Sequence, residues 1–418
     1  MKRGFVKSIV AGGALALSGV AQAADVPAAP KAPESCKAEL SSPTWGSTIK
    51  ANPEPYCFPV PAIGDIYVGA ALSAYGYSGT NPFPYSSGPA SSDRRERFDY
   101  SNLLAWAQKA DGPFQFFVMA GGYALPTLGT TNLSATEQMD RLFGPVPIAW
   151  GKLVLSDEWS IQAGRLPTLI GTEPAFTFQN QNIQRGLLFA QENVINQGVQ
   201  VNYSNGPGSL SVAGTDGFYS GRISWFTGSL SYKIDDSNTV GVNGGFNAGR
   251  TSMFNQTARY MFATPLNQQN SGIISANYAY SSGPLTITPY VQYTNVDRDV
   301  KIGIMGSAST FGAALLASYA FTDNISLAGR IEYTEQSGRR DSLAPNLLGF
   351  GPGSSAFSFT VTPTYTYQRF FVRGEYSIVS LAGITRGDLN QGTVGTGFGR
   401  SGNKTDQQRF LIETGFVF

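Results

Sequence analysis

The chain is 418 residues long and poor in charge for that length. Only 14% of its residues are charged, against about 25% in an ordinary soluble domain, while 12% are aromatic and 49 residues are glycine. This composition suits a polypeptide with much of its surface facing something other than water. The chain has no histidine, which excludes Ser/His and Cys/His dyads, His-ligated metals and His proton relays. We therefore expect no enzymatic activity, no metal and no other cofactor.

The net charge gives no sign of a nucleic-acid partner. The chain has 29 basic and 28 acidic residues. Without the leader described next, which contains Lys2, Arg3 and Lys7 and no acidic residue, 26 basic residues face 28 acidic ones, a net charge of −2. A nucleic-acid-binding protein carries a clustered basic excess, and this sequence has none.

Residues 1–23 have the pattern of a cleaved signal peptide. A basic start is followed by an apolar stretch and by Ala21-Gln22-Ala23, the small-x-small pattern of a signal-peptidase site. The apolar stretch is shorter than the ~20 residues of a membrane-spanning helix, so a retained anchor is the weaker alternative. The pattern predicts an exported protein whose mature chain begins at Ala24.

Residues 24–64 are rich in proline and lack a periodic pattern, which predicts an irregular periplasmic extension. Cys36 and Cys57, the only two cysteines, lie inside it. In an exported protein two cysteines favour one disulfide, which would close a loop of about 20 residues and contribute ~3 kcal/mol. Two free thiols are an alternative. A metal site is a poorer one, because two thiolates without histidine offer too few ligands.

From Asp65 to Phe418 apolar and polar residues repeatedly alternate, which is the period of a β-strand. In the last segment Phe410 and Phe416 share one face, while Arg409 and Glu413 share the other. The pattern predicts sixteen strands, at about 66–77, 97–109, 113–123, 146–156, 159–168, 196–205, 208–217, 222–234, 239–249, 270–282, 284–297, 309–321, 324–336, 355–367, 369–381 and 407–418.

The connections between these segments alternate in length. Tight turns such as Asp111-Gly112 and Ser282-Gly283 are followed by long connections such as 124–145 and 169–195. Short turns at one end and long loops at the other are typical of an all-β transmembrane antiparallel barrel, with short periplasmic turns and long extracellular loops. A secreted propeller or sandwich is the alternative, but its apolar faces should point inward. We expect residues 65–418 to form the barrel.

Three stretches in the middle of the chain resemble the central region of the OmpL-like β-barrel porin family. They are AGRLPTLIGTE at 163–173, QNIQRG at 181–186 and GVQVNY at 198–203. The aromatic C-terminus, Phe418, is similarly shared with outer-membrane barrels as a class. The resemblance covers most of the chain after residue 60. It implies an outer-membrane porin and transfers no catalytic residue.

A barrel of sixteen strands is too wide for side chains alone to fill, so we expect a water-filled lumen. Such a lumen needs a structural element that selects which solutes pass. The longest connection, 169–195, contains Glu173, Arg185 and Glu192 among phenylalanines and leucines. Apolar residues could pack on the inner wall while the charges face the passage, and the corresponding loop of general porins folds inward. The alternative is an external loop that forms a cap or a subunit contact.

Strand parity places six charged residues on the inner wall. Opposed arginines and carboxylates across an aperture would create a transverse field that favours small polar solutes. A mutually neutralising charge lattice without a selective role is an equal alternative. Arg165 has lipid-facing parity near a strand end, which suggests a rim or loop-anchoring role. The six wall residues are Arg330, Glu332, Arg373, Glu375, Arg409 and Glu413.

Together these features predict a porin of the bacterial outer membrane that passes small hydrophilic solutes by passive diffusion. Its expected partners are outer-membrane lipids, small polar solutes and two further copies of itself, because sixteen-stranded general porins form trimers. A plugged or structural barrel acting as an anchor or adhesin is the alternative. The near-zero net charge argues against a strong ion preference.

Overall fold

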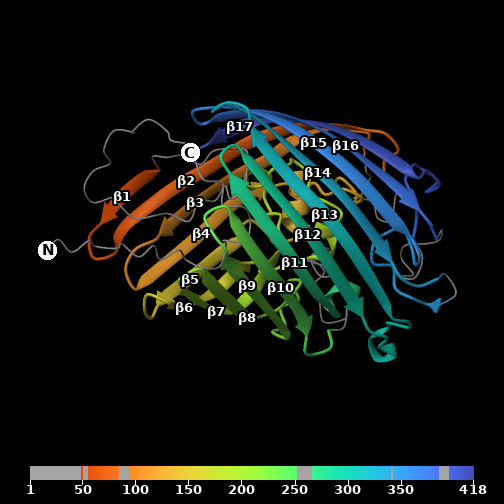
Figure 1. Ribbon diagram of the computed structural model, residues 1–418, viewed down its shortest axis with the longest axis horizontal. Coiled ribbons are helices and arrows are strands. Elements are labelled where there is room, and N and C mark those ends of the chain that lie inside the picture. The colour runs from red at the N-terminus through yellow and green to blue at the C-terminus, as the bar shows by residue number, and fades with distance from the viewer. Residues whose placement is uncertain (1–48, 50–54, 84–93, 252–265, 340–341, 386–394) are drawn as a thin grey trace.

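The computed structural model describes residue 49 and residues 55–83, 94–251, 266–339, 342–385 and 395–418. Sixteen antiparallel strands, β2 to β17, form a closed barrel in which each strand pairs with the next and β17 pairs with β2 (Figure 1). The barrel strands are β2 (Gly64–Gly79), β3 (Glu96–Lys109), β4 (Phe114–Tyr123), β5 (Ile148–Val154), β6 (Trp159–Pro167), β7 (Ile195–Asn205), β8 (Gly208–Thr215), β9 (Trp225–Lys233), β10 (Asn238–Asn247), β11 (Ser271–Ser282), β12 (Leu285–Val296), β13 (Ala308–Ala320), β14 (Ile325–Gln336), β15 (Ser355–Tyr367), β16 (Phe370–Ala382) and β17 (Asp406–Val417).

The helices are short and lie in the long connections. Among the described residues, no helix combines the length and the apolar character needed to cross a membrane. The connections contain α1 (Ala135–Arg141), α2 (Leu266–Gln269) and the 3₁₀ helices η1 (Thr177–Gln179), η2 (Leu188–Gln191) and η5 (Val300–Ile302). The predicted barrel of sixteen strands is confirmed, and the predicted strand bounds differ from the observed ones by about three residues or fewer.

An additional strand, β1 (Tyr56–Val60), lies where the sequence predicts an irregular segment. It pairs with residues 64–68 of β2. Further along the same edge, β2 pairs with β17 instead of β1. At the change-over, Phe418 and Ala70 exchange backbone hydrogen bonds. β1 therefore covers the part of this edge that β17 leaves unpaired. β1 is itself an edge strand, a position in which the proline that it contains is tolerated. The proline-rich composition concealed this strand.

Cys57 lies in β1 and is disulfide-bonded. Cys36, the only other cysteine of the chain, lies outside the described residues, as do the signal peptide and most of the predicted extension. The pairing of these two cysteines stays a prediction. Ile49, the one described residue of that region before position 55, is buried in an apolar cluster with inner-wall residues of β2 to β5.

Burial alternates along the strands with the predicted parity. In β17 Arg409, Leu411 and Glu413 are buried, while Phe410 and Ile412 are exposed. The same alternation in β14 and β16 buries every charged residue that parity placed inside. The exposed face is mostly apolar along the middle of these strands, as expected for a barrel whose outer surface is solvated by lipid.

Gly164 in β6 offers a test of the strand pairing. Its φ is +135°, and a Cβ atom there would lie 2.2 Å from the carbonyl oxygen of Ala149 in β5. We expect Gly164→Ala to destabilise the barrel by about 1–3 kcal/mol, because the backbone must leave a conformation that only glycine adopts easily. The urea midpoint of the heat-modifiable gel shift measures the change.

Gly151→Ala in the neighbouring strand is the matched control, since nothing lies within 4 Å of its added Cβ. Equal midpoints for the two variants would contradict the observed register of β5 and β6.

Candidate pore constriction

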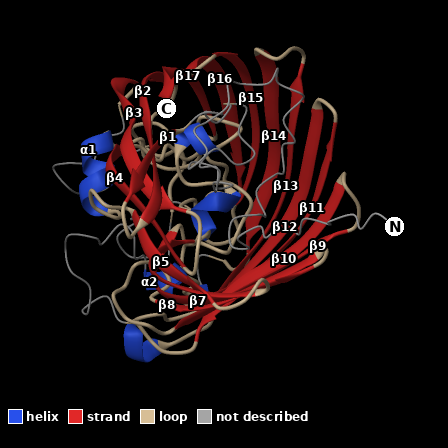
Figure 2. Cartoon of the chain, turned by 90° about the vertical axis from the view of Figure 1, so that its left-hand side faces the viewer, coloured by secondary structure: helices blue, strands red, loops and turns tan. Residues whose placement is uncertain are grey.

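The connection between β6 and β7, residues 168–194, lies inside the barrel. Figure 2 shows loops and short helices enclosed between the wall that contains β3 to β5 and the wall that contains β13 to β16. η1 contacts β3, and η2 contacts β13. The loop thus crosses the lumen and touches the wall on both sides. This is the inward arrangement that the sequence suggested, rather than an external cap.

The first contact is apolar. Phe178 stacks on Trp106 of β3 with ring centroids 5.8 Å apart and an angle of 4° between the planes. Phe176 meets Tyr123 of β4 edge to face at 5.4 Å. Both phenylalanines are fully buried among inner-wall residues. Aromatic pairs of this kind add about 0.5–1.5 kcal/mol beyond the burial of area, so they anchor η1 on this wall.

The second contact is polar and involves the loop backbone. Glu375 of β16 accepts hydrogen bonds from the amides of residues 183 and 184, the latter at 3.0 Å. Glu332 of β14 accepts from the amides of residues 187 and 188 at 3.0 and 3.3 Å. Glu173, within the loop itself, accepts from the amide of Gly186 at 2.8 Å. Three carboxylates therefore satisfy five of the six amides of residues 183–188, and the amide of Arg185 donates to the carbonyl of Pro126 instead.

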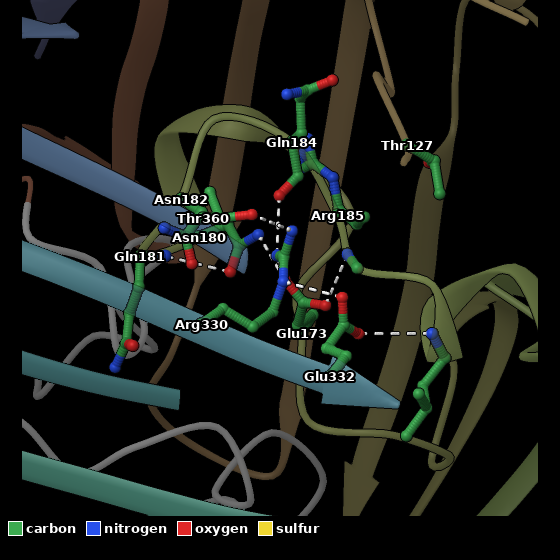
Figure 3. Close-up of polar contacts among 12 residues, drawn as sticks. Thr127, Glu173, Asn180, Gln181, Asn182, Gln184, Arg185, Arg330, Glu332 and Thr360 are labelled. Atoms are coloured by element: carbon green, nitrogen blue, oxygen red, sulfur yellow. Dashed lines mark hydrogen bonds and ion pairs between the residues drawn. The ribbon is translucent and has the colours of Figure 1, made fainter. Parts of the chain in front are cut away.

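Wall arginines bind carbonyl groups of the loops. Arg330 donates to the carbonyl oxygen of Gln184 at 2.8 Å (Figure 3), and Arg373 donates to that of Asn180 at 3.0 Å. Arg409 donates to the carbonyl of Thr127, at 2.9 Å, in the connection between β4 and β5. Because buried carbonyl and amide groups need partners, these arginines and the carboxylates act as complementary supports.

The same side chains form buried ion pairs. Arg330 lies 2.6 Å from Glu173 and 3.1 Å from Glu332, and Arg373 lies 2.7 Å from Glu413. Glu413 also accepts from the hydroxyl of Thr177 at 2.6 Å. Hydrogen bonds on both partners offset the desolvation of such pairs, and removal of one partner typically costs about 3–5 kcal/mol.

Arg185 has no such partner. Its backbone bridges in parallel to Thr127, and its Nη2 donates to the carbonyl of Ile183 at 3.0 Å. The Nε and Nη1 atoms are buried without a hydrogen-bond partner. Burial lowers the pKa of Arg185 to about 10, since desolvation outweighs the nearby carboxylates.

Glu192 lies at the other end of the loop and accepts from the Tyr290 hydroxyl at 3.1 Å. Burial raises its pKa well above the usual range, and the negative charge of Glu173 raises it further. The neutral form of Glu192 is therefore favoured.

All nine predicted site residues are buried, with exposed fractions of 5% or less. They contact the loops and one another rather than open water, which favours the neutralising lattice over a field across an open aperture. Arg165 binds the carbonyl of Val146 and lies 5.8 Å from the Tyr219 ring, in keeping with an anchoring role at the rim.

Sequence reasoning missed the part played by the connection between β4 and β5. Its residue Leu128 donates a backbone hydrogen bond to the carbonyl of Arg185 at 2.9 Å, and its Pro126 carbonyl accepts one from the amide of Arg185 at 2.9 Å. The signal was weak, because the contact uses backbone groups and an isolated bridge rather than charged side chains.

A further sector of the inner wall is polar and uncharged. The inward-facing residues of β7, β8, β10, β11 and β12 include no charged side chain. Several of their buried polar atoms lack a protein partner, so water is needed to satisfy them. These atoms belong to Asn243, Asn277, Gln292 and Thr294.

Within the described ranges, no group of three or more Cys, Asp and Glu residues has an arrangement that could hold a metal ion. Five of the nine charged residues form buried ion pairs, and the other four bind backbone groups or neutral side chains.

The family model described as "Putative beta-barrel porin-2, OmpL-like" matches residues 65–418. No curated protein sequence matches the chain. At these low identities, the solved structures similar to the chain show the fold alone. An anion-selective porin from Comamonas acidovorans is 12% identical, with a TM-score of 0.53 and coverage of 84% of this chain and 99% of that one.

Two further solved structures have similar scores. The outer-membrane channel DcaP of Acinetobacter baumannii is 10% identical, with a TM-score of 0.54 and coverage of 86% and 99%. The trimer form of OmpT, an outer-membrane protein of Vibrio cholerae, is 10% identical, with a TM-score of 0.52 and coverage of 84% and 99%.

Hydrogen exchange can test the support given by Glu332. We expect Glu332→Gln to accelerate exchange of the amides of Leu187 and Leu188 about 10- to 100-fold, because hydrogen bonds to a charged acceptor contribute about 1.5–3 kcal/mol. Mass spectrometry of peptides covering residues 183–191 measures the rates.

Glu335→Gln is the matched control on the same strand, since Glu335 is exposed and bonds the Tyr333 hydroxyl. Unchanged exchange in the Glu332 variant would remove this carboxylate from the loop's supports.

Proposed function

The chain belongs to the OmpL-like family of β-barrel porins, and from this premise we propose how it passes small hydrophilic solutes. It is a porin of the bacterial outer membrane, a channel for passive diffusion. The observation that carries the mechanism is the loop of residues 168–194, which crosses the lumen and is bound to the wall on both sides. We propose that this loop is the constriction.

The solute path runs between the loop and the uncharged sector of the wall. Two features of that sector support this path. Its inner side chains are uncharged and mostly polar, and the unpartnered atoms of Asn243 and Asn277 call for water. The other walls bind the loop through aromatic rings or buried ion pairs, which leaves them less room for solute.

The constriction has nearly balanced charge. Four arginines and five glutamates surround the loop, and burial favours the neutral form of Glu192. This balance supports weak ion selectivity and a preference for small polar solutes. Inside this lattice the charged residues hold the loop and largely neutralise one another.

The family and fold are those of a channel rather than of an enzyme. We extend this to the absence of catalysis, since the sequence lacks histidine and no acidic pair stands out. The assembly is proposed to be a homotrimer, supported by the trimer form of the structurally similar OmpT.

A closed barrel serving as an anchor is the second candidate. It is favoured by the low exposure of the inner charges and by an aromatic cluster at the long-loop end. There the rings of Phe83, Phe350 and Phe398 lie 5.8–6.3 Å apart in pairs. Single-channel recording separates the two candidates, because only a porin conducts without ligand.

Shortening the loop should widen the channel. With residues 173–192 replaced by a brief Gly-Ser linker, we expect larger single-channel conductance steps in a planar bilayer, because the segment that crosses the lumen is gone. The heat-modifiable gel shift verifies folding before recording. Conductance equal to that of the parent would reject the constriction, and silence from both folded proteins would favour the closed barrel.

Asn277→Asp tests the proposed path with a change of charge but little change of shape. We expect the zero-current potential in a salt gradient to shift toward cations, because the added carboxylate would face the conducting water. Asn205→Asp is the matched control, because Asn205 is the exposed last residue of β7, beside the turn to β8. Equal potentials for both variants would move the path away from β11.

A further inference from the structure

β9 and β10 present an ordered column of side chains on the outer face of the barrel. Their register continues past the strand ends, where Ala248 donates a backbone hydrogen bond to Ser224 at 2.8 Å and Arg222 donates to the Arg250 carbonyl at 2.7 Å. From the long-loop rim downward, the outward neighbours are Arg222 and Arg250, Ser224 and Ala248, Phe226 and Phe246, Gly228 and Gly244, and Leu230 and Val242.

The paired glycines form the floor of an apolar hollow of about 460 Å³. Gly228 and Gly244 lie directly opposite each other, and the rings of Phe226 and Phe246 border them on the rim side. A glycine inside a strand weakens it and often marks a place where another group approaches closely. The hollow therefore suits an apolar chain lying against the barrel.

The top of the column is basic. Arg222 and Arg250 are both exposed, the Arg250 side chain by 58%. Asp299 binds the Nε of Arg250 at 2.7 Å. Among the described residues, no carboxylate pairs with the terminal nitrogens of Arg250 or Arg222. Asp299 lies in the connection between β12 and β13, which also contains Arg298, Lys301 and Asp297. Basic residues therefore outnumber acidic ones at the top of the column.

The spacing matches one leaflet of a membrane. Six residues separate Arg222 from Gly228, which is roughly 20 Å along a strand. With a strand tilt of about 40° this becomes roughly 15 Å of depth, half the ~30 Å hydrocarbon thickness. The two arginines thus lie at the water interface. The phenylalanine pair lies below them at the level of the aromatic girdle, and the hollow lies at the depth of the acyl chains.

We propose that this column binds an anionic, phosphate-bearing lipid of the outer leaflet. Arg222 and Arg250 bind the phosphate group, and one acyl chain lies in the hollow over Gly228 and Gly244. The charge at the rim selects a lipid head group, which an apolar hollow alone would not do. The proposal rests on the outer-membrane location but not on conduction, so a closed barrel would bind the lipid equally well.

Native mass spectrometry of the mature protein in detergent, with added diphosphorylated lipid A, tests the site. We expect one tightly bound lipid per subunit. Arg222→Gln and Arg250→Gln should each weaken binding about fivefold, since a basic residue near an anionic surface contributes ~1 kcal/mol. Gly228→Leu should abolish the tight site by filling the hollow, and its added Cβ meets no atom closer than 3.8 Å.

Two control variants carry the same changes elsewhere on the barrel. Gly329→Leu lies on the outer face of β14, where an added Cβ meets no atom closer than 3.7 Å, and Arg400→Gln lies in another exposed loop. Both should bind lipid like the parent, and excess inorganic phosphate should not displace it.

Three results would overturn the proposal. Equal losses in the test and control variants would indicate nonspecific annular lipid. Unchanged binding in all variants would remove the lipid from this column. A change in subunit number with Gly228→Leu, without loss of lipid, would assign the hollow to a contact between copies.

Discussion

An irregular backbone inside a barrel must find a hydrogen-bond partner for each buried polar group. The loop of residues 168–194 has little regular structure of its own, yet it crosses the lumen. Its amides meet carboxylates of β14 and β16, and its carbonyls meet arginines of β14 and β16. The wall thus needs both arginines and glutamates, because the loop backbone presents both carbonyl and amide groups. The ion pairs between these side chains reduce the cost of burying each charge.

The inner wall divides into sectors with different tasks. Strands β3 and β4 offer aromatic rings on which η1 packs. Strands β14, β16 and β17 offer charges that hold the loop backbone and Glu173. The uncharged inner faces of β7, β8, β10, β11 and β12 bind the loop through neutral side chains such as Asn243 and Gln292, and some of their buried polar atoms lack a protein partner, which favours water. Charge therefore positions the loop on one side of the lumen, and the proposed solute path lies on the other.

Much of the fold follows from local patterns. Alternation with a period of two predicts all sixteen barrel strands, and parity places Arg330, Glu375 and Glu413 correctly on the inner wall. These features need only neighbouring residues. The inward loop was also foreseeable, because it mixes phenylalanines with charges.

The partners of those residues could not be predicted in the same way. The contact between Glu375 and the amides of residues 183 and 184 joins positions about 190 residues apart, and only the closed barrel brings them together. β1 was missed because its proline hid an edge strand. Arg185 was singled out for its charge, but its burial without a carboxylate partner depends on the packing of two loops.

The most direct test of this account is an experimental structure of the mature protein in detergent or lipid that places side chains. We expect residues 168–194 to lie inside the barrel, with the carboxylate of Glu375 within hydrogen-bonding distance of the amides of Ile183 and Gln184. A loop outside the barrel, with Glu375 facing bulk water, would contradict it.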